Sequence, residues 1–244
     1  MGEPGTGDFL PKQPKGIGDH TKEKSTVPIA SFLSTTLPEF TASFASIESG
    51  NLYRIASIPS KEEAARLAML EKEVRIFKSK DGNVYIIKGE GDDENDNNRV
   101  GVTKEIHNQL DPVYDAHTHS SKHRHDIRDK NIFVENLPSV GDLTSKGSLD
   151  IVNYIFTEYG RTSFLRTRNY TAGGLDNDGR SMTQRTVLNA LHEAVREARA
   201  AGVSEDAEAC LNFMGNYMDT LGCKFQFEPW DKVENIEKPP ENFN

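Results

Sequence analysis

The segment that most restricts the fold of this chain is a strand-like run, residues 112–119, that ends in two histidines. Side chains at alternate positions of a strand point to the same face, so His117 and His119 can aim two imidazoles at one point. Two imidazole nitrogens, each about 2.0–2.1 Å from one metal ion, make half of a tetrahedral zinc site. His123 and His125 follow, so four of the seven histidines fall within nine residues. The run therefore predicts a strand that carries metal ligands, with a pair of surface histidines on a polar loop as the alternative.

The composition limits which ligands such a site can use. Cys210 and Cys223 are the only cysteines. Two cysteines make neither a disulfide scaffold nor a cysteine-rich zinc site, although one disulfide between them stays open. A transition metal in this protein must therefore be held by histidine and carboxylate side chains.

Charge and hydropathy limit the partners. The chain has 29 basic and 38 acidic residues, and the resulting net charge of −9 disfavours a nucleic-acid partner because it repels phosphates. No apolar run approaches about 18 residues, so we expect no membrane-spanning segment. The first residues lack the charged and apolar pattern of a Sec signal. Both a cytoplasmic location and delivery by a specialised secretion system fit this pattern.

Local patterns predict the elements around the histidine-bearing strand. Ser60 followed by Glu63 is a capping box that opens a helix over 61–72. Two β-rich runs around an Asp-Gly turn predict a hairpin over 74–87. A further hairpin is expected over 151–166. Apolar stripes typical of helices follow over 183–201 and 204–221, and a short strand is expected over 223–227.

Common catalytic motifs are absent or incomplete. His192-Glu193 begins like the helical zinc-protease motif, but Arg196 stands where the second histidine must be. The cysteine pair of the zinc deaminases, the nucleophile elbow of the α/β-hydrolases and the Walker loop do not occur. The remaining candidates for metal chemistry are therefore the histidines near residue 120.

One resemblance uses more than these histidines. His117-Thr118-His119, followed by Pro138-Ser139-Val140-Gly141-Asp142, resembles the His-x-His … Pro-Ser-x-x-Asp core of the JAB/JAMM (MPN) zinc metalloproteases. The expected helix at 61–72, the hairpin at 74–87 and a helix after Asp142 are similar to that family's order of elements. The similarity is closest to the divergent JAMM-like domains at the C-terminal ends of bacterial polymorphic toxins, and it covers residues 55–170.

The resemblance implies a site and a reaction. It makes His117, His119 and Asp142 the three protein ligands of Zn²⁺, with water in the fourth position. It also implies a glutamate at the start of a strand that takes a proton from water; Glu73 is the best match and Glu71 the second. Ser139 takes the place of the serine whose hydroxyl stabilises the oxyanion. The implied reaction is hydrolysis of a peptide or isopeptide bond in a protein or peptide substrate.

The chain departs from the family pattern in three respects. Residues 120–141 put 22 residues between His119 and Asp142, more than the family usually has. Each doubling of loop length costs only about 0.6 kcal/mol, so the insertion is tolerable, but it must border the substrate groove. Ser120 stands where a proline commonly follows the histidine pair. Glu73 is assigned from its strand position alone.

Three other functions stay open. The first is a catalytically inactive JAMM-like module that binds a partner. The second follows from Asp115 to Ser120, which resemble the Asp-x-His-x-His-Ser opening of PHP-type phosphoesterases and amidohydrolases; after His125, however, only His192 is left to build such a site. The third is a metal-dependent nuclease. Its metal site would use the histidines from His117 to His125 with Asp126 and Asn131, and its phosphate contacts would come from Lys122, Arg124, Arg128 and Lys130.

The resemblance and the local patterns together predict the organisation of the chain. The fold class implied is α/β, a cytidine-deaminase-like mixed β-sheet flanked by helices, with an appended C-terminal helical pair. The expected parts are a flexible arm over 1–45, a JAMM-like metallohydrolase domain over 46–175, a helical extension over 176–230 and a polar tail over 231–244. A secreted effector or toxin-type domain is the setting that the resemblance suggests.

Overall fold

The structure is a computed structural model, and it describes only part of the chain. The described residues are 37, 39–89, 110–120, 136, 138, 142–143, 151–167, 193, 196–203, 207–219 and 222–243. Several features expected from the sequence lie outside them, namely most of the 1–45 arm, residues 121–135 with His123 and His125, Ser139, and most of the 183–201 helix with His192.

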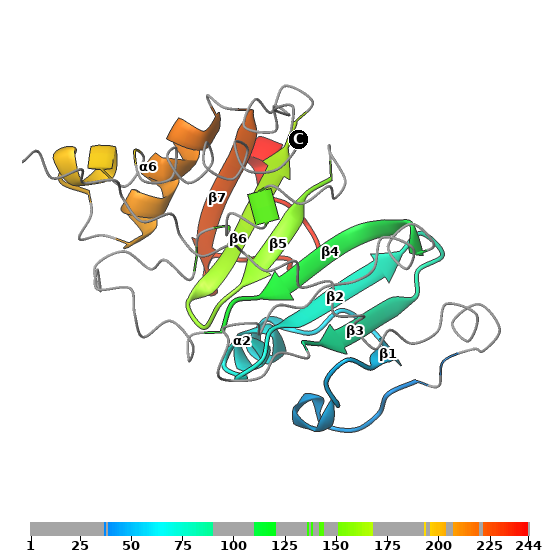
Figure 1. The fold of residues 1–244 in the computed structure, drawn as a ribbon. Coiled ribbons are helices and arrows are strands. Elements are labelled where there is room, and N and C mark those ends of the chain that lie inside the picture. The colour runs from blue at the N-terminus through cyan, green and yellow to red at the C-terminus, as the bar shows by residue number, and fades with distance from the viewer. Residues whose placement is uncertain are drawn as a thin grey trace, which may run out of the picture.

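Seven strands form one mixed sheet in the described part of the chain, in the order β1-β3-β2-β4-β5-β6-β7 (Figure 1). Neighbouring strands are antiparallel except β4 and β5, which run parallel. The strands are β1 (Leu52–Ile55), β2 (Val74–Ser79), β3 (Val84–Lys88), β4 (Pro112–Thr118), β5 (Asn153–Phe156), β6 (Gly160–Arg166) and β7 (Cys223–Pro229). The helical elements are η1 (Phe44–Ser46), α2 (Lys61–Ala68), α6 (Ala207–Asp219) and η5 (Glu241–Phe243). The α/β class with a mixed sheet is thus confirmed.

Helix α2 begins at the expected capping box. The Ser60 hydroxyl accepts the Glu63 N–H at 3.2 Å, and the Glu63 carboxylate accepts the Ser60 N–H at 2.8 Å. The helix ends at Ala68 rather than near residue 72, because the last turn tightens and Leu70 turns its carbonyl towards the hydroxyl of Ser120, 2.6 Å away. A tertiary contact thus ends the helix earlier than its local pattern predicts.

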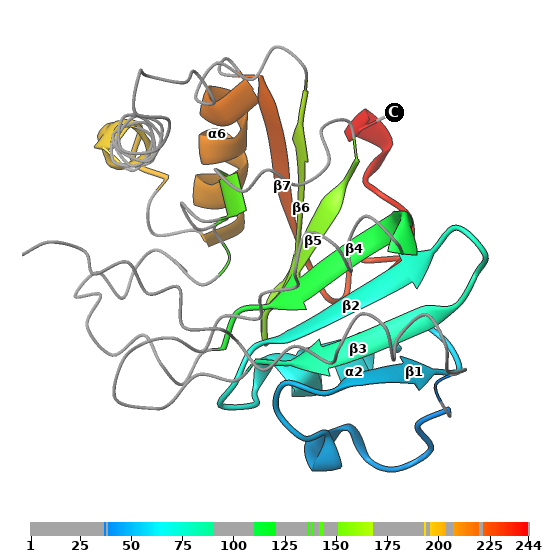
Figure 2. The ribbon, with the colours of Figure 1, turned by 45° about the vertical axis from the view of Figure 1, so that its right-hand side comes forward.

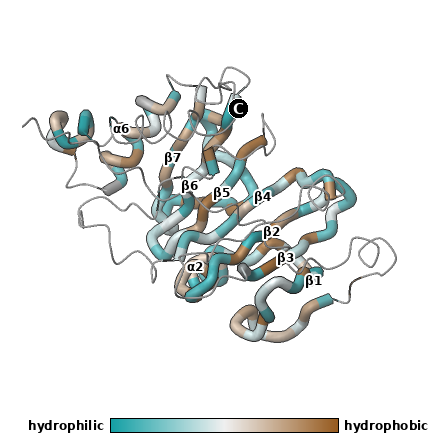
Figure 3. The backbone as a smooth tube through the Cα atoms, viewed as in Figure 1, coloured by the Kyte–Doolittle hydropathy of each residue, from teal (hydrophilic) through white to brown (hydrophobic). Residues whose placement is uncertain are grey.

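Both expected hairpins are present. β2 pairs antiparallel with β3, and Gly82 in the connecting turn has a φ of 89°, which favours glycine. β5 pairs antiparallel with β6 through the turn before Gly160. Apolar and polar residues follow one another in short segments along these strands (Figure 3), as the alternation in the sequence indicates.

One face of the sheet is covered by α2. Ile76, Ala116 and Phe156, from three adjacent strands, share a buried cluster with Ala64 and Leu67 of the helix. In Figure 2, α2 lies behind β2 and β3, on the side of the sheet that these residues face.

The other face is covered by α6 at one end, where the helix lies beside β7 (Figure 2). Leu211 and Met214 of the helix share a cluster with Ile155 and Phe225 of the sheet. Cys210 and Cys223 are buried here and free, so the open question of a disulfide is settled. The expected strand at 223–227 is confirmed as β7 and belongs to the same sheet as the histidine-bearing strand. Among the described residues, no helix is long and apolar enough to cross a membrane.

The C-terminal segment 231–243 lies on the α2 side of the sheet, although its composition predicts a polar tail. Val233 is fully buried, and Phe243 is nearly so. The indole N–H of Trp230 donates to the carbonyl of Thr157 at 2.9 Å, which starts the segment on its path across the strands. Arg161 then binds the backbone carbonyls of the segment. Backbone contacts of this kind have no side-chain pattern, which explains why the sequence did not indicate them.

Candidate metal centre

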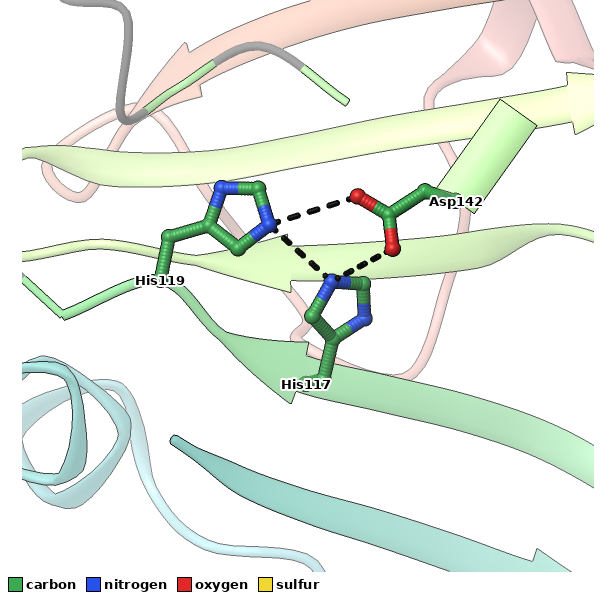
Figure 4. A group of neighbouring side chains, drawn as sticks. All are labelled: His117, His119 and Asp142. Carbon is green, nitrogen blue, oxygen red and sulfur yellow. Dashed lines mark hydrogen bonds and ion pairs between the residues drawn. The ribbon is translucent and has the colours of Figure 1, made fainter. Parts of the chain in front are cut away.

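His117, His119 and Asp142 come together at the end of β4. Nε2 of His117 lies 3.1 Å from Nε2 of His119, and the two nitrogens lie 3.2 and 3.3 Å from separate oxygens of Asp142. Figure 4 shows the three side chains pointing toward one another. Their ligand atoms all lie within 4.8 Å of one another, so this group could hold a metal ion. The expected ligand triad is therefore assembled.

Hydrogen bonds fix the end of β4 that carries both imidazoles. The N–H of His119 donates to the carbonyl of Phe156 at 3.0 Å. The hydroxyl of Thr118 accepts the N–H of Val74 at 2.9 Å, on the opposite face. Ser120 is buried and donates to the Leu70 carbonyl, so it anchors the chain in the place where the family commonly has proline. The imidazoles therefore project from backbone that is held on both sides.

Asp142 reaches the histidines from a separate segment. Residues 142–143 are helical, and Leu143 is buried in the cluster that includes Ile155 and α6. Packing of Leu143 against the sheet thus holds Asp142 beside the ends of β4 and β5. The helix expected after Asp142 is described only for these two residues.

In the triad, the charged forms of His117 and Asp142 stabilise each other. Burial lowers the pKa of His117, but the charge and hydrogen bond of Asp142, with a smaller effect of Glu73, raise it on balance. Burial raises the pKa of Asp142, but the two imidazoles hold it well below its ordinary value. The carboxylate is therefore ionised and available as a ligand at neutral pH. His119 is only 2 % exposed, so a bound ion would be shielded from solvent on that side.

Glu73 directly precedes β2 and lies close enough to the triad to act on it electrostatically. Arg75 is the Cα partner of His117, and the same antiparallel register continued by two residues brings Glu73 opposite His119. The carbonyl of Glu73 accepts the N–H of Gly89 at 2.8 Å, which ties this residue to the end of β3. Its charge acts on His117. The alternative base, Glu71, is exposed.

The sequence did not indicate the polar cluster at the start of the segment that leads to Asp142. Asn136 is fully buried; its side-chain oxygen accepts the hydroxyl of Thr157, and its carbonyl accepts the hydroxyl of Thr162 at 2.5 Å. Because His119 bonds to the residue before Thr157, the cluster adjoins the triad. Pro138 is also buried, whereas Ser139 lies outside the described residues.

The sequence also did not indicate an ion pair on the face of the triad. Arg75 Nε and Nη2 donate to the two carboxylate oxygens of Asp115 at 2.9 and 2.6 Å. Asp115 lies two positions before His117, and Arg75 lies two positions after Glu73. The period of two along each strand was therefore the signal that could have placed both residues on the face of the triad. In the PHP-type alternative, Asp115 would belong to the metal motif; here its carboxylate is bound by arginine. The histidines, acids and cations of the nuclease alternative beyond His119 lie outside the described residues.

A cavity of about 410 Å³ lies between η1 and α2 and is separate from the triad. Phe44, Ile55 and Arg66 contribute to its walls, as does Leu70. The carbonyl of Leu70 binds Ser120, which is the connection between the cavity wall and the end of β4. No triad residue lines the cavity.

The chain matches no family model, no curated protein and no solved structure. The resemblance to the JAB/JAMM family therefore remains an expectation that rests on the motif residues. The observations that bear on function are the arrangement of His117, His119 and Asp142 and the position of Glu73 beside them.

Proposed function

We propose that this chain is a zinc-dependent hydrolase of peptide or isopeptide bonds with a JAMM-like, cytidine-deaminase-like fold. The observation that carries the proposal is the convergence of two imidazole nitrogens and one carboxylate, with a glutamate directly before the neighbouring strand. The order of α2, the β2–β3 hairpin, the histidine-bearing β4 and the segment with Asp142 supports the choice of fold.

The donor set fits zinc better than the common hard cations. Ca²⁺ and Mg²⁺ take oxygen ligands, whereas two histidines and one carboxylate are a known ligand set of catalytic zinc sites. Such sites keep one position open, and three protein ligands leave that position here. Zinc bound by this set supplies Lewis-acid chemistry, which polarises a carbonyl and lowers the pKa of water.

The side chains around the triad have distinct roles in this proposal. His117, His119 and Asp142 hold the ion. Glu73 accepts a proton from the attacking water at a carboxylate oxygen and passes it to the amine that leaves. Ser139 donates its hydroxyl to the oxyanion, where losing one donor costs about 2.7–4 kcal/mol in the barrier. The substrate is a protein or peptide, and an effector or toxin-type setting is part of the proposal.

Zinc content and hydrolysis together test the proposal. We expect one zinc per chain, lost when His117, His119 or Asp142 becomes alanine and kept in the matched control His192→Ala. Elemental analysis of the purified proteins measures this. Zinc that depended on His123 and His125 instead would favour the nuclease alternative.

The reaction is tested with peptide and isopeptide substrates and Glu73→Gln. This variant keeps zinc and fold but should lose hydrolysis, since an amide of nearly the same shape cannot accept the proton. Glu71→Gln is the matched control and should remain active. A zinc-loaded wild type that cleaves none of the substrates would favour a binding module, and full activity in Glu73→Gln would remove this residue from the mechanism.

A further inference from the structure

Arg75 has a guanidinium edge that its own ion pair does not use. A guanidinium carries five N–H groups in a fixed planar fork, so it can bind one carboxylate through Nε and one Nη and a second through the outer Nη1–Nη2 edge. Asp115 occupies the first edge, through Nε at 2.9 Å and Nη2 at 2.6 Å. In the part of the chain that the structure describes, no acceptor binds the second edge.

The Arg75 side chain is partly exposed. The side chain retains 24 % of its exposure, whereas that of Asp115 retains 7 %. Among the described residues, no protein group accepts a hydrogen bond from Nη1 of Arg75. An external ligand can therefore approach the edge without displacing Asp115.

The position of Arg75 relates this edge to the metal centre. Arg75 is the Cα partner of His117, so both side chains project from the same face of the sheet. The charge of Asp142 acts on Arg75, which places the guanidinium within electrostatic reach of the triad. The ring of Phe77 lies 5.0 Å from the guanidinium carbon and, with Asp115, holds the group in place.

We propose that the outer edge of Arg75 is a subsite that binds a carboxylate of the substrate beside the metal centre. The inference rests on the proposed hydrolase function and names its substrate class: peptides with a free C-terminal carboxylate, from which the last residue is released. The scissile amide and the carboxylate of such a residue are separated by one Cα. A ligand with this spacing can place its amide at the triad and its carboxylate on the neighbouring arginine.

Recognition in this subsite depends on geometry more than on net charge. Asp115 already neutralises Arg75, so a second carboxylate is bound by two parallel N–H donors rather than by an excess of positive charge. Lysine can keep the ion pair with Asp115, but it has no second planar edge. Arg75→Lys is therefore the informative variant, because it preserves the charge and removes only the fork.

The test compares acetyl-Ala-Ala with its C-terminal amide as ligands, measured by NMR titration of metal-free and zinc-loaded protein. In the wild type we expect the free acid to bind about tenfold more tightly than the amide, as a charge-assisted hydrogen bond allows. Arg75→Lys should lose this preference while keeping its zinc content and melting temperature. The matched control is Arg54→Lys on β1, an arginine 33 % exposed and 4.0 Å from Glu39, which should keep the preference.

A second variant covers the case in which Arg75→Lys does not fold. Arg75→Gln with Asp115→Asn removes both charges, leaves no unpaired buried carboxylate and should also lose the preference for the acid. Equal affinity for acid and amide in the wild type, or a preference that survives in either variant, would overturn the subsite. If the wild type binds zinc but shows no preference, the subsite fails and the zinc site stands. If the wild type binds no zinc but prefers the acid, and Arg75→Lys loses that preference, the subsite stands and the zinc site fails.

Discussion

Nε2 of His117 lies 3.2 Å from Oδ1 of Asp142, so a partly buried carboxylate faces the nitrogen with which this imidazole would bind a metal ion. Burial alone would lower the pKa of His117, and the charge of Asp142 reverses that effect. In the metal-free protein the two groups therefore favour the imidazolium–carboxylate form. The proton and the metal ion compete for one nitrogen.

The first prediction concerns the titration of His117 in the metal-free protein. We expect its NMR midpoint above 6.5, and a lower midpoint in Asp142→Asn, because the amide removes the charge and leaves the burial. The control Glu73→Gln should lower the midpoint less, since Glu73 contributes less than Asp142. An unchanged midpoint in Asp142→Asn would contradict the role given to this carboxylate.

The second prediction follows from the same contact by linkage. A raised histidine pKa gives the metal-free protein stability that is fully present below 6.5 and is lost as the pH rises through the raised pKa. Zinc requires the neutral imidazole, so zinc affinity should fall as the pH drops through that same pKa. Denaturant unfolding of the metal-free protein and chelator competition for zinc measure the two trends. Parallel trends, with stability and affinity falling together, would contradict the prediction.

The third prediction concerns Asn136, whose two contacts anchor the segment that leads to Asp142. Asn136→Ala keeps the backbone carbonyl that accepts from Thr162 but removes the amide oxygen that accepts from Thr157, whose hydroxyl is left with the Gly160 carbonyl at 3.3 Å. We therefore expect a loss of about 1–3 kcal/mol in the free energy of unfolding. Zinc affinity should fall by about 10–100-fold, as it does when a partner outside the ligand shell is lost. The matched control is Asn153→Ala on β5, whose amide binds the Ile151 carbonyl at 2.9 Å. Equal effects of both variants on zinc would show that the anchor does not act on the site.

Local patterns carried most of what the sequence predicted. The β-rich runs around an Asp-Gly turn located β2 and β3, and the period of two along β4 put His117 and His119 on one face. The bidentate contact of Arg75 with Asp115 depends on the pairing of β2 with β4. The parallel pairing of β4 with β5 likewise depends on segments far apart in the sequence. Local sequence patterns do not indicate which distant strands pair, so only the structure gave the strand order of the sheet.

The fourth prediction concerns the close approach of α6 to β7 at Gly215. A Cβ at this position would lie 2.3 Å from the carbonyl oxygen of Phe225, which is backbone and cannot easily move. Alanine in a free helix would be about 1 kcal/mol more favourable than glycine, but overpacking costs about 1–3 kcal/mol, so the clash should prevail. Gly215→Ala should therefore lower the melting temperature, and the exposed control Asn216→Ala should not. A more stable Gly215→Ala would mean that the helix does not pack this closely.

The fifth prediction concerns the contacts that hold the C-terminal segment on the sheet. Arg161 is 2 % exposed; its Nη2 lies 2.6 Å from Glu228, and its Nη1 donates to three carbonyls of residues 235–238 at 2.8 to 3.1 Å. Arg161→Met should cost about 3–5 kcal/mol in the free energy of unfolding, because it leaves Glu228 as a poorly solvated, unpaired charge.

A double variant separates the ion pair from the anchoring of the segment. Arg161→Met with Glu228→Gln removes the unpaired charge, so it should recover part of the stability, but the carbonyls of 235–238 still lack their donor. Limited proteolysis should therefore cut within 231–243 faster than in the wild type. The control Lys78→Gln breaks only an exposed pair with Glu237 and should cost less than about 1 kcal/mol. If the double variant matched the wild type in both stability and protection, the segment would be held by its apolar side chains, such as Val233, and not by Arg161.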